Sequence, residues 1–329
     1  MKRRTFIKNT GKLMATGIVM PKSILAQINN SSEGKVVLIT GTSSGFGYHM
    51  ALTFARAGHN TYASMRNIKT KNKNVADQFL EIQKKEKLNL NLIELDVTKS
   101  KQCKEVIDHI ISKENKIDIL INNAGIFAYC PMEIVPKELW ELQMRTNVFG
   151  PMELAGLVLP HMRENKSGLI IQVSSRVGRV VIPGISLYCS SKFALETATE
   201  GAHYEATSQG IDFAIIQPTA YKTKVNPNAR KLYSEFTRPL IEVQRPQGTK
   251  FHEDFLNILN NDFSGIPTRN PQEIADLALK ISQTPRDIRK LRYPMGDSWE
   301  VNPLKEINSQ ISNMQKSALR GRYENWYRN

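Results

Sequence analysis

Short runs of hydrophobic residues alternate with longer amphipathic stretches along most of this chain. The segment 35–40, Lys-Val-Val-Leu-Ile-Thr, is dominated by aliphatic side chains and leads into a cluster of glycines. A run of this kind, without alternation of polar and apolar positions, is typical of a strand that is buried on both faces of a sheet. Similar runs predict further strands at 61–64, 90–95, 117–121, 169–173 and 211–216, and a last short strand at 291–294.

Segments with helical periodicity lie between most of these strands. A helix is expected from about Gly45 to Ala57, and another over 271–282, opened by Asn270 as its cap with Pro271 at the first position. Parallel strands need crossovers that are long enough to hold a helix, so this alternation indicates βαβ units around one parallel sheet. The expected fold class is therefore α/β.

Composition supports one main domain, which we predict over 33–300. Of the 329 residues, 40% are hydrophobic and 23% are charged, as in an ordinary globular protein. The periodic pattern weakens over 222–267, where aromatic residues are scattered among Lys, Arg, Pro and Asn, and this segment is expected to form a lid over a substrate site. Residues 301–329 are polar and basic and predict a C-terminal extension, either a peripheral helix or a tail.

The first 26 residues, 1–26, carry a pattern of their own. Met-Lys-Arg-Arg-Thr-Phe-Ile-Lys places Arg3 and Arg4 ahead of a mildly apolar stretch, Leu13–Met20, with small residues near Ala26. The pattern resembles a bacterial twin-arginine (Tat) export signal and predicts a protein that export machinery delivers to the periplasm or beyond. The apolar stretch is too short to span a membrane by itself. Two alternatives stay open: a basic N-terminus of a cytoplasmic protein, and a signal that is kept as an anchor.

The formal charge of +14 does not indicate a nucleic-acid partner. Six of the basic residues precede residue 27, where no acid occurs, and the others are spread among acids. The three cysteines, Cys103, Cys130 and Cys189, lack close pairing and predict free thiols, not a disulfide framework or a zinc site. The six histidines show no metal-ligand spacing. We therefore expect no bound metal.

Three glycines, Gly41, Gly45 and Gly47, separate the first predicted strand from the first helix. Glycines at such a turn let the backbone approach a pyrophosphate, whose charge is met by free N–H groups at the start of the helix. A glycine cluster also occurs in ordinary tight turns. Here the strand–turn–helix context that a phosphate-binding loop requires is present.

Tyr188 and Lys192 lie four residues apart, and hence on one face of a predicted helix. A free tyrosine has a pKa of about 10 and is a poor base at neutral pH, but a neighbouring ammonium favours the phenolate. Tyr188 is then suited to exchange a proton with a substrate oxygen as general acid or base. The same spacing also arises by chance among surface residues, so the motifs around it decide whether the pair is interpreted as catalytic.

These motifs, taken in order, resemble the short-chain dehydrogenase/reductase (SDR) family. Ile121-Asn-Asn-Ala-Gly125 matches the family's N-N-A-G segment, Asn147 lies in a Thr-Asn-Val-Phe-Gly context, and Asp96 follows the third strand. With Ser175, Tyr188 and Lys192 the match covers residues 35 to about 225, and more loosely extends to Pro294. The resemblance implies a Rossmann-type doubly wound parallel sheet in three α/β/α layers, as a single domain with a lid-like insert.

The resemblance also implies roles for individual residues. Tyr188 is expected to be the general acid/base and Lys192 its partner, while Ser175 holds the substrate oxygen and Ser174 is a structural neighbour. Asn147 is expected to order backbone and water near Lys192. The alternatives are a turn-capping hydroxyl for Ser175 and a buried, satisfied amide for Asn147. The expected cofactor-binding residues are Gly41, Ser43, Ser44, Gly45, Phe46, Gly47, Arg66, Asp96, Val97, Asn123, Ala124, Gly125, Tyr188, Lys192, Pro218 and Thr223.

The end of the second strand favours NADP(H) over NAD(H). An acid at this point binds a ribose 2′-hydroxyl, whereas an arginine accommodates a 2′-phosphate. No Asp or Glu occurs between Gly47 and Asp77, and Arg66 stands in the expected place. A solvated surface charge is the alternative for Arg66. One departure from the family concerns Thr219, which replaces the glycine that usually follows Pro218 and puts the local backbone path in doubt.

Together these residues predict an NADP(H)-dependent oxidoreductase that transfers a hydride reversibly between a secondary alcohol and a ketone or aldehyde. The alternative is a non-catalytic NAD(P)-binding or sensing protein that retains the fold. A serine hydrolase is excluded, because no G-x-S-x-G elbow surrounds Ser175. The segments Trp140–Met162 and Phe193–Ala198 are apolar over much of their circumference and need cover on their outer faces. Members of the family that the chain resembles commonly associate through the corresponding helices, so the resemblance implies a homo-oligomer, a dimer or a tetramer. The sequence does not identify the substrate.

Overall fold

Seven strands form one parallel sheet in the part of the chain that the computed structural model describes, residues 34–237 and 269–320. The sheet order is β3-β2-β1-β4-β5-β6-β7, and every neighbouring pair is parallel. The strands are β1 (Val36–Ile39), β2 (Asn60–Met65), β3 (Leu90–Glu94), β4 (Ile119–Asn122), β5 (Gly168–Val173), β6 (Ile211–Pro218) and β7 (Arg292–Met295). All seven strands expected from the sequence are therefore confirmed, with shifts of one or two residues at their ends.

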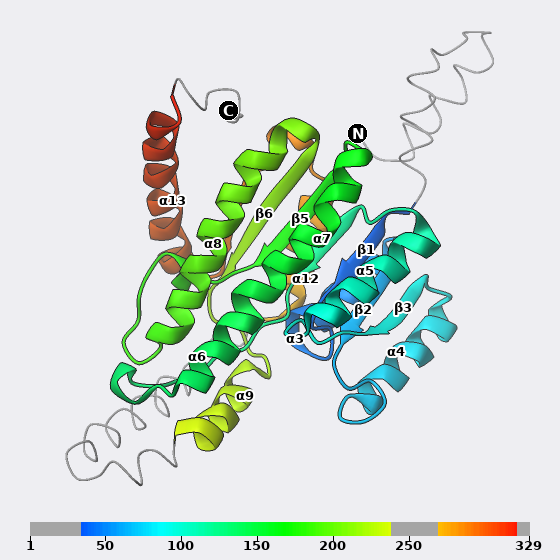
Figure 1. The fold of residues 1–329 in the computed structure, drawn as a ribbon, viewed down its shortest axis with the longest axis horizontal. Coiled ribbons are helices and arrows are strands. Elements are labelled where there is room, and N and C mark those ends of the chain that lie inside the picture. Colours follow the sequence, from blue (N-terminus) through cyan, green and yellow to red (C-terminus); the bar gives the residue numbers. More distant parts are fainter. Residues whose placement is uncertain (1–33, 238–268, 321–329) are drawn as a thin grey trace. The chain divides into compact units, whose positions relative to one another are not determined.

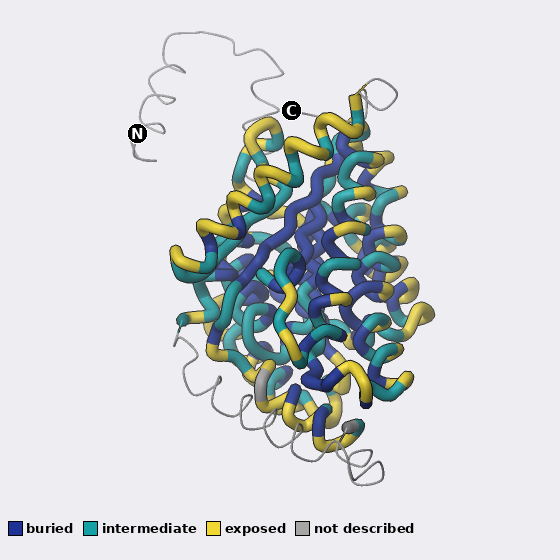
Figure 2. The backbone as a smooth tube through the Cα atoms, turned by 90° about the vertical axis from the view of Figure 1, so that its left-hand side faces the viewer, coloured by how far each residue is buried: buried dark blue, intermediate teal, exposed yellow. Residues whose placement is uncertain are grey.

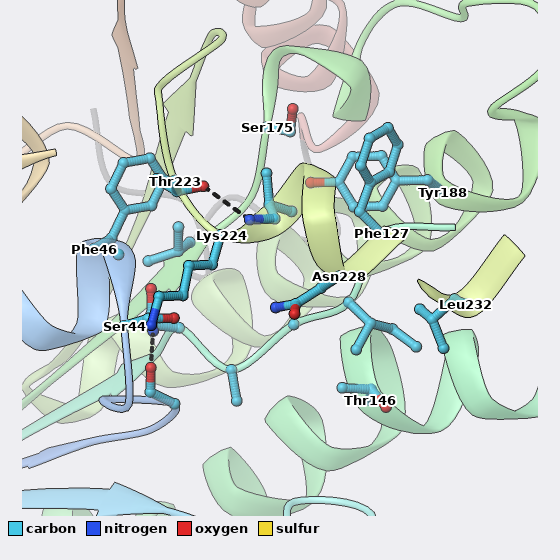
Figure 3. A pocket seen from close by; sticks show the side chains of 18 of the residues that line it. Ser44, Phe46, Phe127, Thr146, Ser175, Tyr188, Thr223, Lys224, Asn228 and Leu232 are labelled. Atoms are coloured by element: carbon cyan, nitrogen blue, oxygen red, sulfur yellow. Dashed lines mark hydrogen bonds between the residues drawn. The ribbon is translucent and has the colours of Figure 1, made fainter. Parts of the chain in front are cut away.

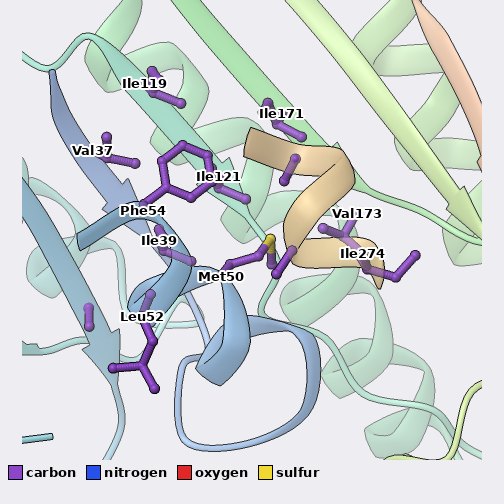
Figure 4. Packing of buried hydrophobic residues seen from close by; sticks show 14 of the residues in the cluster. Val37, Ile39, Met50, Leu52, Phe54, Ile119, Ile121, Ile171, Val173 and Ile274 are labelled. Carbon is purple, nitrogen blue, oxygen red and sulfur yellow. The ribbon is translucent and has the colours of Figure 1, made fainter. Parts of the chain in front are cut away.

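Helices cover both faces of the sheet, and the alternation of side chains along each strand explains the two cores. Val37 and Ile39 of β1 pack into one cluster with α3 (Gly45–Arg56), α4 (Lys73–Glu86) and α12 (Gln272–Gln283). Figure 4 shows Met50 and Phe54 of α3 and Ile274 of α12 against the strands of this face.

Val36 and Leu38 face the second cluster, which contains residues of α5 (Ser100–Glu114), α7 (Gly150–Glu164) and α8 (Ser186–Ala206). The helix layers and the sheet between them can be followed in Figure 1, and the buried strands run between more exposed helices in Figure 2. The three-layer, doubly wound arrangement is confirmed.

The apolar segment 140–162 forms a helical path that is interrupted at one place. Between α6 (Lys137–Met144) and α7, residues Arg145–Phe149 form a π-helical turn, and this turn carries Asn147. Single π-turns inside helices are rare and occur frequently at functional sites. A Cβ atom at Gly150 would lie 2.4 Å from the carbonyl oxygen of Val97, so the start of α7 lies directly against the loop after β3.

The final described helix, α13 (Ser298–Ala318), begins a few residues before the predicted peripheral segment. Val301 and Leu304 are its buried residues. Glu300 forms an ion pair with Arg176, and the Asn308 side-chain amide donates a hydrogen bond of 2.7 Å to the Gln217 side-chain oxygen. The first half of α13 is therefore docked on the sheet domain.

Several predictions fall wholly or partly outside the described residues. The predicted export signal, 1–26, lies outside them, as do residues 238–267 of the predicted lid. The described start of the lid forms α9 (Val225–Leu232) and a π-turn, Tyr233–Thr237. Helix α12 begins at Gln272, one residue later than expected, and the Asn270 side chain still accepts a hydrogen bond of 2.9 Å from the Gln272 N–H. None of the described helices is both long and apolar enough to cross a membrane.

Candidate active site

A large cleft lies at the carboxyl ends of the parallel strands. The loops that follow β1 to β6 line a cavity of about 1220 Å³. In an open parallel sheet, ligands bind at this edge, where the strand order reverses direction. Here the reversal falls between β1 and β4, and both loops that leave these strands line the cavity.

The glycine-rich loop after β1 has a conformation that requires its glycines. Gly41 and Gly45 have φ angles of +70° and +57°. A Cβ atom at Gly47 would lie only 2.3 Å from the Gly41 carbonyl oxygen. The loop and the start of α3 are thus packed too closely for a side chain at Gly47, and this residue lies behind the cavity wall.

The N-N-A-G segment after β4 holds this loop in place by hydrogen bonds. The Thr40 hydroxyl accepts hydrogen bonds from the backbone N–H groups of Asn123, at 3.0 Å, and Ala124, at 2.9 Å. The Asn123 side-chain amide donates to the Thr40 and Gly41 carbonyl oxygens at 2.8 Å and 3.1 Å. The two loops at the switch point are therefore one hydrogen-bonded unit.

The start of α3 is suited to an anion. Its cap residue, Ser44, makes no side-chain capping hydrogen bond, and its first turn holds no acid. The first N–H groups of a helix have no partner within the helix and carry partial positive charge, so they bind phosphate. This loop, with the space that only glycines leave, fits the pyrophosphate of a dinucleotide.

The end of β2 presents two basic side chains to the same cavity. Arg66 and Lys71 both line it, and the loop between them is held by a hydrogen bond of 2.6 Å from the Asn72 side chain to the Arg66 carbonyl oxygen. Sequence reasoning identified Arg66 and missed Lys71. At the end of β3, the Asp96 carboxylate accepts from the Thr98 N–H at 3.0 Å and from the Thr98 hydroxyl at 2.7 Å, so it also shapes its own turn.

Lys192 is buried beside Tyr188 on α8. Its ammonium donates a hydrogen bond of 2.9 Å to the Val173 carbonyl oxygen and lies 5.7 Å from the centre of the Tyr188 ring. Only 5% of the Lys192 surface is exposed. Burial lowers the pKa of Lys192 to about 8, and the nearby Glu196 carboxylate acts in the opposite direction.

The structure corrects the expected charge state of Tyr188. Burial raises the pKa of the Tyr188 hydroxyl above its ordinary value, while Ser175 acts in the opposite direction. The sequence predicts a lowered pKa from the neighbouring ammonium, but burial is the largest influence on Tyr188, and the Lys192 ammonium is bonded to the Val173 carbonyl oxygen. Tyr188 is therefore a protonated phenol at neutral pH in this structure.

Ser175 and Asn147 both have structural hydrogen bonds: Ser175 caps a turn, and Asn147 is a buried amide with its hydrogen-bonding groups satisfied. The Ser175 hydroxyl accepts a bond of 3.4 Å from the Val177 N–H and so caps the turn Arg176–Gly178, and it also lines the cavity. The Asn147 amide bonds the Ile126 N–H and carbonyl oxygen, each at 2.9 Å. Asn147 lies behind the cavity wall, and Ile126 lines it.

An aromatic wall continues from Tyr188. The ring centres of Phe127 and Tyr188 are 4.6 Å apart, and those of Phe127 and Tyr129 are 4.3 Å apart. Val177 and Ile185 belong to the same apolar cluster. Figure 3 shows Phe127 and Tyr188 side by side, and Leu232 of α9 among the other side chains that line the cavity. Sequence reasoning missed this wall, although two aromatic residues within four positions after the N-N-A-G segment were a signal for it.

The structure explains how Thr219 is tolerated. A Cβ atom at Gly296, just after β7, would lie 2.0 Å from the Thr219 hydroxyl oxygen. The Thr219 side chain therefore occupies the space that Gly296 leaves free, and its backbone N–H donates to the Met295 carbonyl oxygen at 2.9 Å. The residues that follow lie beside the glycine-rich loop. A Cβ atom at Gly45 would lie 3.5 Å from the Thr223 side chain.

The structure brings nearly all of the residues predicted from the sequence to this cavity. Gly47 and Asn147 are the two that lie behind its wall. The predicted residues that line it are Gly41, Ser43, Ser44, Gly45, Phe46, Arg66, Asp96, Val97, Asn123, Ala124, Gly125, Ser175, Tyr188, Lys192, Pro218 and Thr223. Among the described residues, no cluster of His, Cys, Asp and Glu side chains is arranged to hold a metal ion, and the three cysteines form no disulfide.

A doubly wound sheet with a glycine-rich loop at its switch point, and a Tyr–Lys pair in the same cleft, defines a class of nucleotide-dependent oxidoreductases. The family model described as short chain dehydrogenase matches residues 35–233. The chain belongs to this family and is an oxidoreductase of the SDR type.

Relatives and solved structures agree with this assignment. The chain is 33% identical over 273 residues to the uncharacterized oxidoreductase YusZ of Bacillus subtilis, covering 82% of this chain and 92% of the relative. It is 32% identical over 196 residues to a protein of Bacteroides thetaiotaomicron named 3-ketodihydrosphingosine reductase, covering 60% and 67%.

Among solved structures, a gluconate 5-dehydrogenase from Burkholderia cenocepacia, in complex with NADP and tartrate, is 29% identical with a TM-score of 0.54, covering 59% of this chain and 74% of that one. A short chain dehydrogenase/reductase from Burkholderia phymatum, in complex with NAD, has a TM-score of 0.67 and covers 87% and 95%. Its identity is 18%, so this likeness concerns the fold alone.

Proposed function

We propose that the protein is an NADP(H)-dependent oxidoreductase that transfers a hydride reversibly between a secondary alcohol and a ketone or aldehyde. The observation that carries this proposal is the presence of Tyr188, Lys192 and Ser175 in the same cavity as the glycine-rich loop. The nicotinamide supplies the hydride, and the protein supplies position and the proton.

Proton transfer is assigned to Tyr188. Tyr188 is protonated at neutral pH and so carries the proton that a carbonyl oxygen takes up when it accepts a hydride; burial, which raises the pKa of Tyr188, means that a neighbouring positive charge must stabilise the phenolate. The Ser175 hydroxyl lines the same cavity and is placed to hold that oxygen by a hydrogen bond. With a pKa of about 8, Lys192 carries a charge at neutral pH and stabilises the phenolate that forms when the proton leaves.

The preference for NADP(H) rests on the charge at the end of β2. Arg66 and Lys71 line the cavity there, and no acid occurs between Gly47 and Asp77. Two cations without a carboxylate favour a ribose 2′-phosphate over a free 2′-hydroxyl. The solved structures include complexes with NADP and with NAD, so the proposed preference rests on the charges of this chain.

The substrate is proposed to be a carbonyl compound with an apolar body. The wall next to Tyr188 is built from Phe127, Tyr129, Val177 and Ile185, and removal of apolar surface from water favours an apolar ligand against such a wall. One relative is named 3-ketodihydrosphingosine reductase, and this name, which denotes the reduction of a keto compound, agrees with a carbonyl substrate.

The competing function is a protein that binds NAD(P) without turnover. It predicts no rate with any carbonyl compound, although the cofactor binds. The presence of Ser175, Tyr188 and Lys192 in one cavity favours an enzyme, because binding alone does not need that combination.

The test is NADPH oxidation by the purified protein with a series of ketones and aldehydes of increasing apolar length. We expect turnover, with kcat/KM rising along the series and at least about tenfold higher for NADPH than for NADH. The Arg66→Ala and Lys71→Ala variants should lower that cofactor ratio, whereas Lys69→Ala, which alters a lysine of the same loop that does not line the cavity, should leave it unchanged. NADPH binding without turnover throughout the series would support the competing function.

A further inference from the structure

A fully buried carboxylate lies directly behind the site. Glu196 is 0% exposed and sits on α8 one turn beyond Lys192. The Ser174 hydroxyl donates to its Oε1 atom at 2.9 Å, and the Gln217 side-chain amide donates to both of its oxygens, at 2.9 Å and 3.0 Å. Ser174 directly follows β5, and Gln217 lies near the end of β6. One carboxylate therefore joins α8 to the ends of two strands.

Three residues of α8 lie near three consecutive residues at the end of β5, of which Val173 is the last of the strand. Tyr188, Lys192 and Glu196 are spaced four apart and therefore lie on one face of the helix. Lys192 bonds the Val173 carbonyl oxygen, Glu196 bonds the Ser174 hydroxyl, and Ser175, the next residue, acts on Tyr188. Ser174 directly precedes Ser175, so the Glu196–Ser174 bond holds the chain next to Ser175.

The loop after Ser175 closes tightly over Glu196. A Cβ atom at Gly178 would lie 2.5 Å from Glu196 Oε1 and 2.9 Å from the Ser174 hydroxyl oxygen. Gln217 directly precedes Pro218, which lines the cavity from the other side. Glu196 is therefore bonded to the residues that directly precede Ser175 and Pro218, one on each wall of the cavity.

The charge of Glu196 is balanced by two arginines. Arg292 Nε lies 2.9 Å and Arg179 Nε 3.2 Å from Glu196 Oε2. The same two guanidinium groups contact Glu200 at 2.5 Å and 3.5 Å. Two carboxylates and two guanidinium groups leave this cluster neutral. Loss of either carboxylate gives it a net positive charge, but Glu196 is the one that faces Lys192.

We propose that Glu196 is a positioning residue of the reaction, which holds Ser175 in the cavity through Ser174 and places a carboxylate one helical turn from Lys192. This inference rests on the proposed function. A carboxylate is needed because every contact it makes is with a donor: a hydroxyl, an amide and two guanidinium groups. A glutamine in its place turns an N–H₂ group toward some of these donors. Ser174, interpreted from the sequence as a structural neighbour, becomes the link between Glu196 and Ser175.

The groups around Lys192 determine whether loss of the Glu196 charge raises or lowers the pKa of Lys192. They are the Val173 carbonyl oxygen, the Tyr188 ring and the Glu196 carboxylate, with Arg179 and Arg292 behind Glu196. Removing the negative charge leaves the two arginines in excess, which disfavours the Lys192 ammonium. Lys192 then loses its proton at a lower pH.

The experiment compares Glu196→Gln with Glu200→Gln, which removes a charge from the same arginine cluster without touching Ser174 or Gln217. Titration of Lys192 is followed by NMR in the cofactor-free protein, with the Lys192 signal assigned from Lys192→Met. We expect Lys192 to titrate about one pH unit lower in Glu196→Gln, an effect of the size that one neighbouring charge produces, and within about 0.3 units of wild type in Glu200→Gln.

Turnover is measured on the same two proteins. For Glu196→Gln we expect kcat to fall at least about tenfold and its high-pH limb to move down with Lys192, while the NADPH dissociation constant stays within about threefold. For Glu200→Gln we expect kcat within about threefold of wild type. Equal effects of the two variants on Lys192 titration, kcat and thermal stability would overturn the proposal and leave only a stabilising ion-pair network.

Ser174→Ala keeps the test decisive if Glu196→Gln does not fold. Removing this hydroxyl cuts the link to Ser175 and leaves all charges in place, so kcat should fall several-fold with the Lys192 titration unchanged. Unchanged kcat in Ser174→Ala would contradict the positioning role. Because Lys192 titrates without substrate or cofactor, a wild-type protein that turns over no carbonyl compound refutes the proposed function, while the comparison of the two glutamine variants still tests the electrostatic part of this inference.

Discussion

The contacts around Gly47 show how much depends on single residues in the cofactor loop. A Cβ atom there would lie 2.3 Å from the Gly41 carbonyl oxygen and 2.5 Å from the Asn123 amide nitrogen. Gly156 on α7 is a matched control, because the same atom there meets nothing within 4 Å. We expect Gly47→Ala to weaken NADPH binding at least tenfold and to lower the free energy of unfolding by about 1–3 kcal/mol, as overpacking does.

Gly156→Ala should keep NADPH affinity and change the free energy of unfolding by at most about 1 kcal/mol, in the stabilising direction, because alanine has the higher helix propensity. Calorimetric titration with NADPH and urea unfolding measure both quantities. Equal NADPH affinity of the two variants would mean that the loop does not need its tight packing to hold the cofactor.

At the scale of residues, the sequence predicted which side chains lie together in the cavity. It did not predict the groups to which those side chains form hydrogen bonds. Tyr188 and Lys192 share a helix face by their spacing alone, and the structure places both in the cavity. The partner of Lys192 is the Val173 carbonyl oxygen, and Asn147 bonds the backbone of Ile126 in addition to the Ser191 hydroxyl. Every residue has these backbone groups, so the sequence carries no signal for such contacts. The raised pKa of Tyr188 was missed because it depends on burial.

Among the elements, α13 has one docked half and one exposed half. Leu304, near its start, is 2% exposed, and Met314, near its end, is 74% exposed. We expect Leu304→Ala to lower the free energy of unfolding by about 2–5 kcal/mol, as for other buried leucines. Met314→Ala should change it by less than about 0.5 kcal/mol. Urea unfolding of both variants gives the comparison, and similar losses would contradict the docking of α13 through its first half.

Element types followed from the sequence more reliably than their irregularities. The apolar runs were clearest for β1 and β4, which are buried along their whole length and are almost entirely aliphatic. The π-turn at Arg145–Phe149 was not predicted, because an added residue only shifts an apolar stripe, and the segment 140–162 is apolar over too much of its circumference for such a shift to be recognised. The docking of α13 was missed for another reason: Val301 and Leu304 are its two buried residues within 21, too few for a periodic signal.

For the whole molecule, we propose a homo-oligomer, a dimer or a tetramer, formed through the outer faces of the helices over 140–162 and 193–198. Phe149, at the end of the π-turn, is 58% exposed, and a large exposed aromatic side chain on such a face is suited to an interface. Light scattering should give two or four times the mass of one chain, and Phe149→Glu should shift it toward one. A single-chain mass for the wild-type protein at micromolar concentration would contradict this.

The first residues lead to a second proposal at this scale, export of the protein by a twin-arginine route. Arg3 and Arg4 stand ahead of an apolar stretch, as such a signal requires. In a bacterial host, the wild-type chain should be recovered in the periplasm, and the Arg3→Lys, Arg4→Lys double variant should stay in the cytoplasm with its charge preserved. Equal distribution of the two proteins would favour a basic N-terminus without a targeting role.

The central claim is that Tyr188 transfers the proton in a reaction driven by NADPH. It is tested most directly by NADPH oxidation with a reactive ketone, comparing wild type with Tyr188→Phe, a change that removes one hydroxyl and keeps the ring against Phe127. We expect the rate to fall by about 10²–10⁴-fold, the contribution of a positioned general acid, with NADPH affinity within about threefold of wild type. Equal rates in the two proteins would contradict the mechanism.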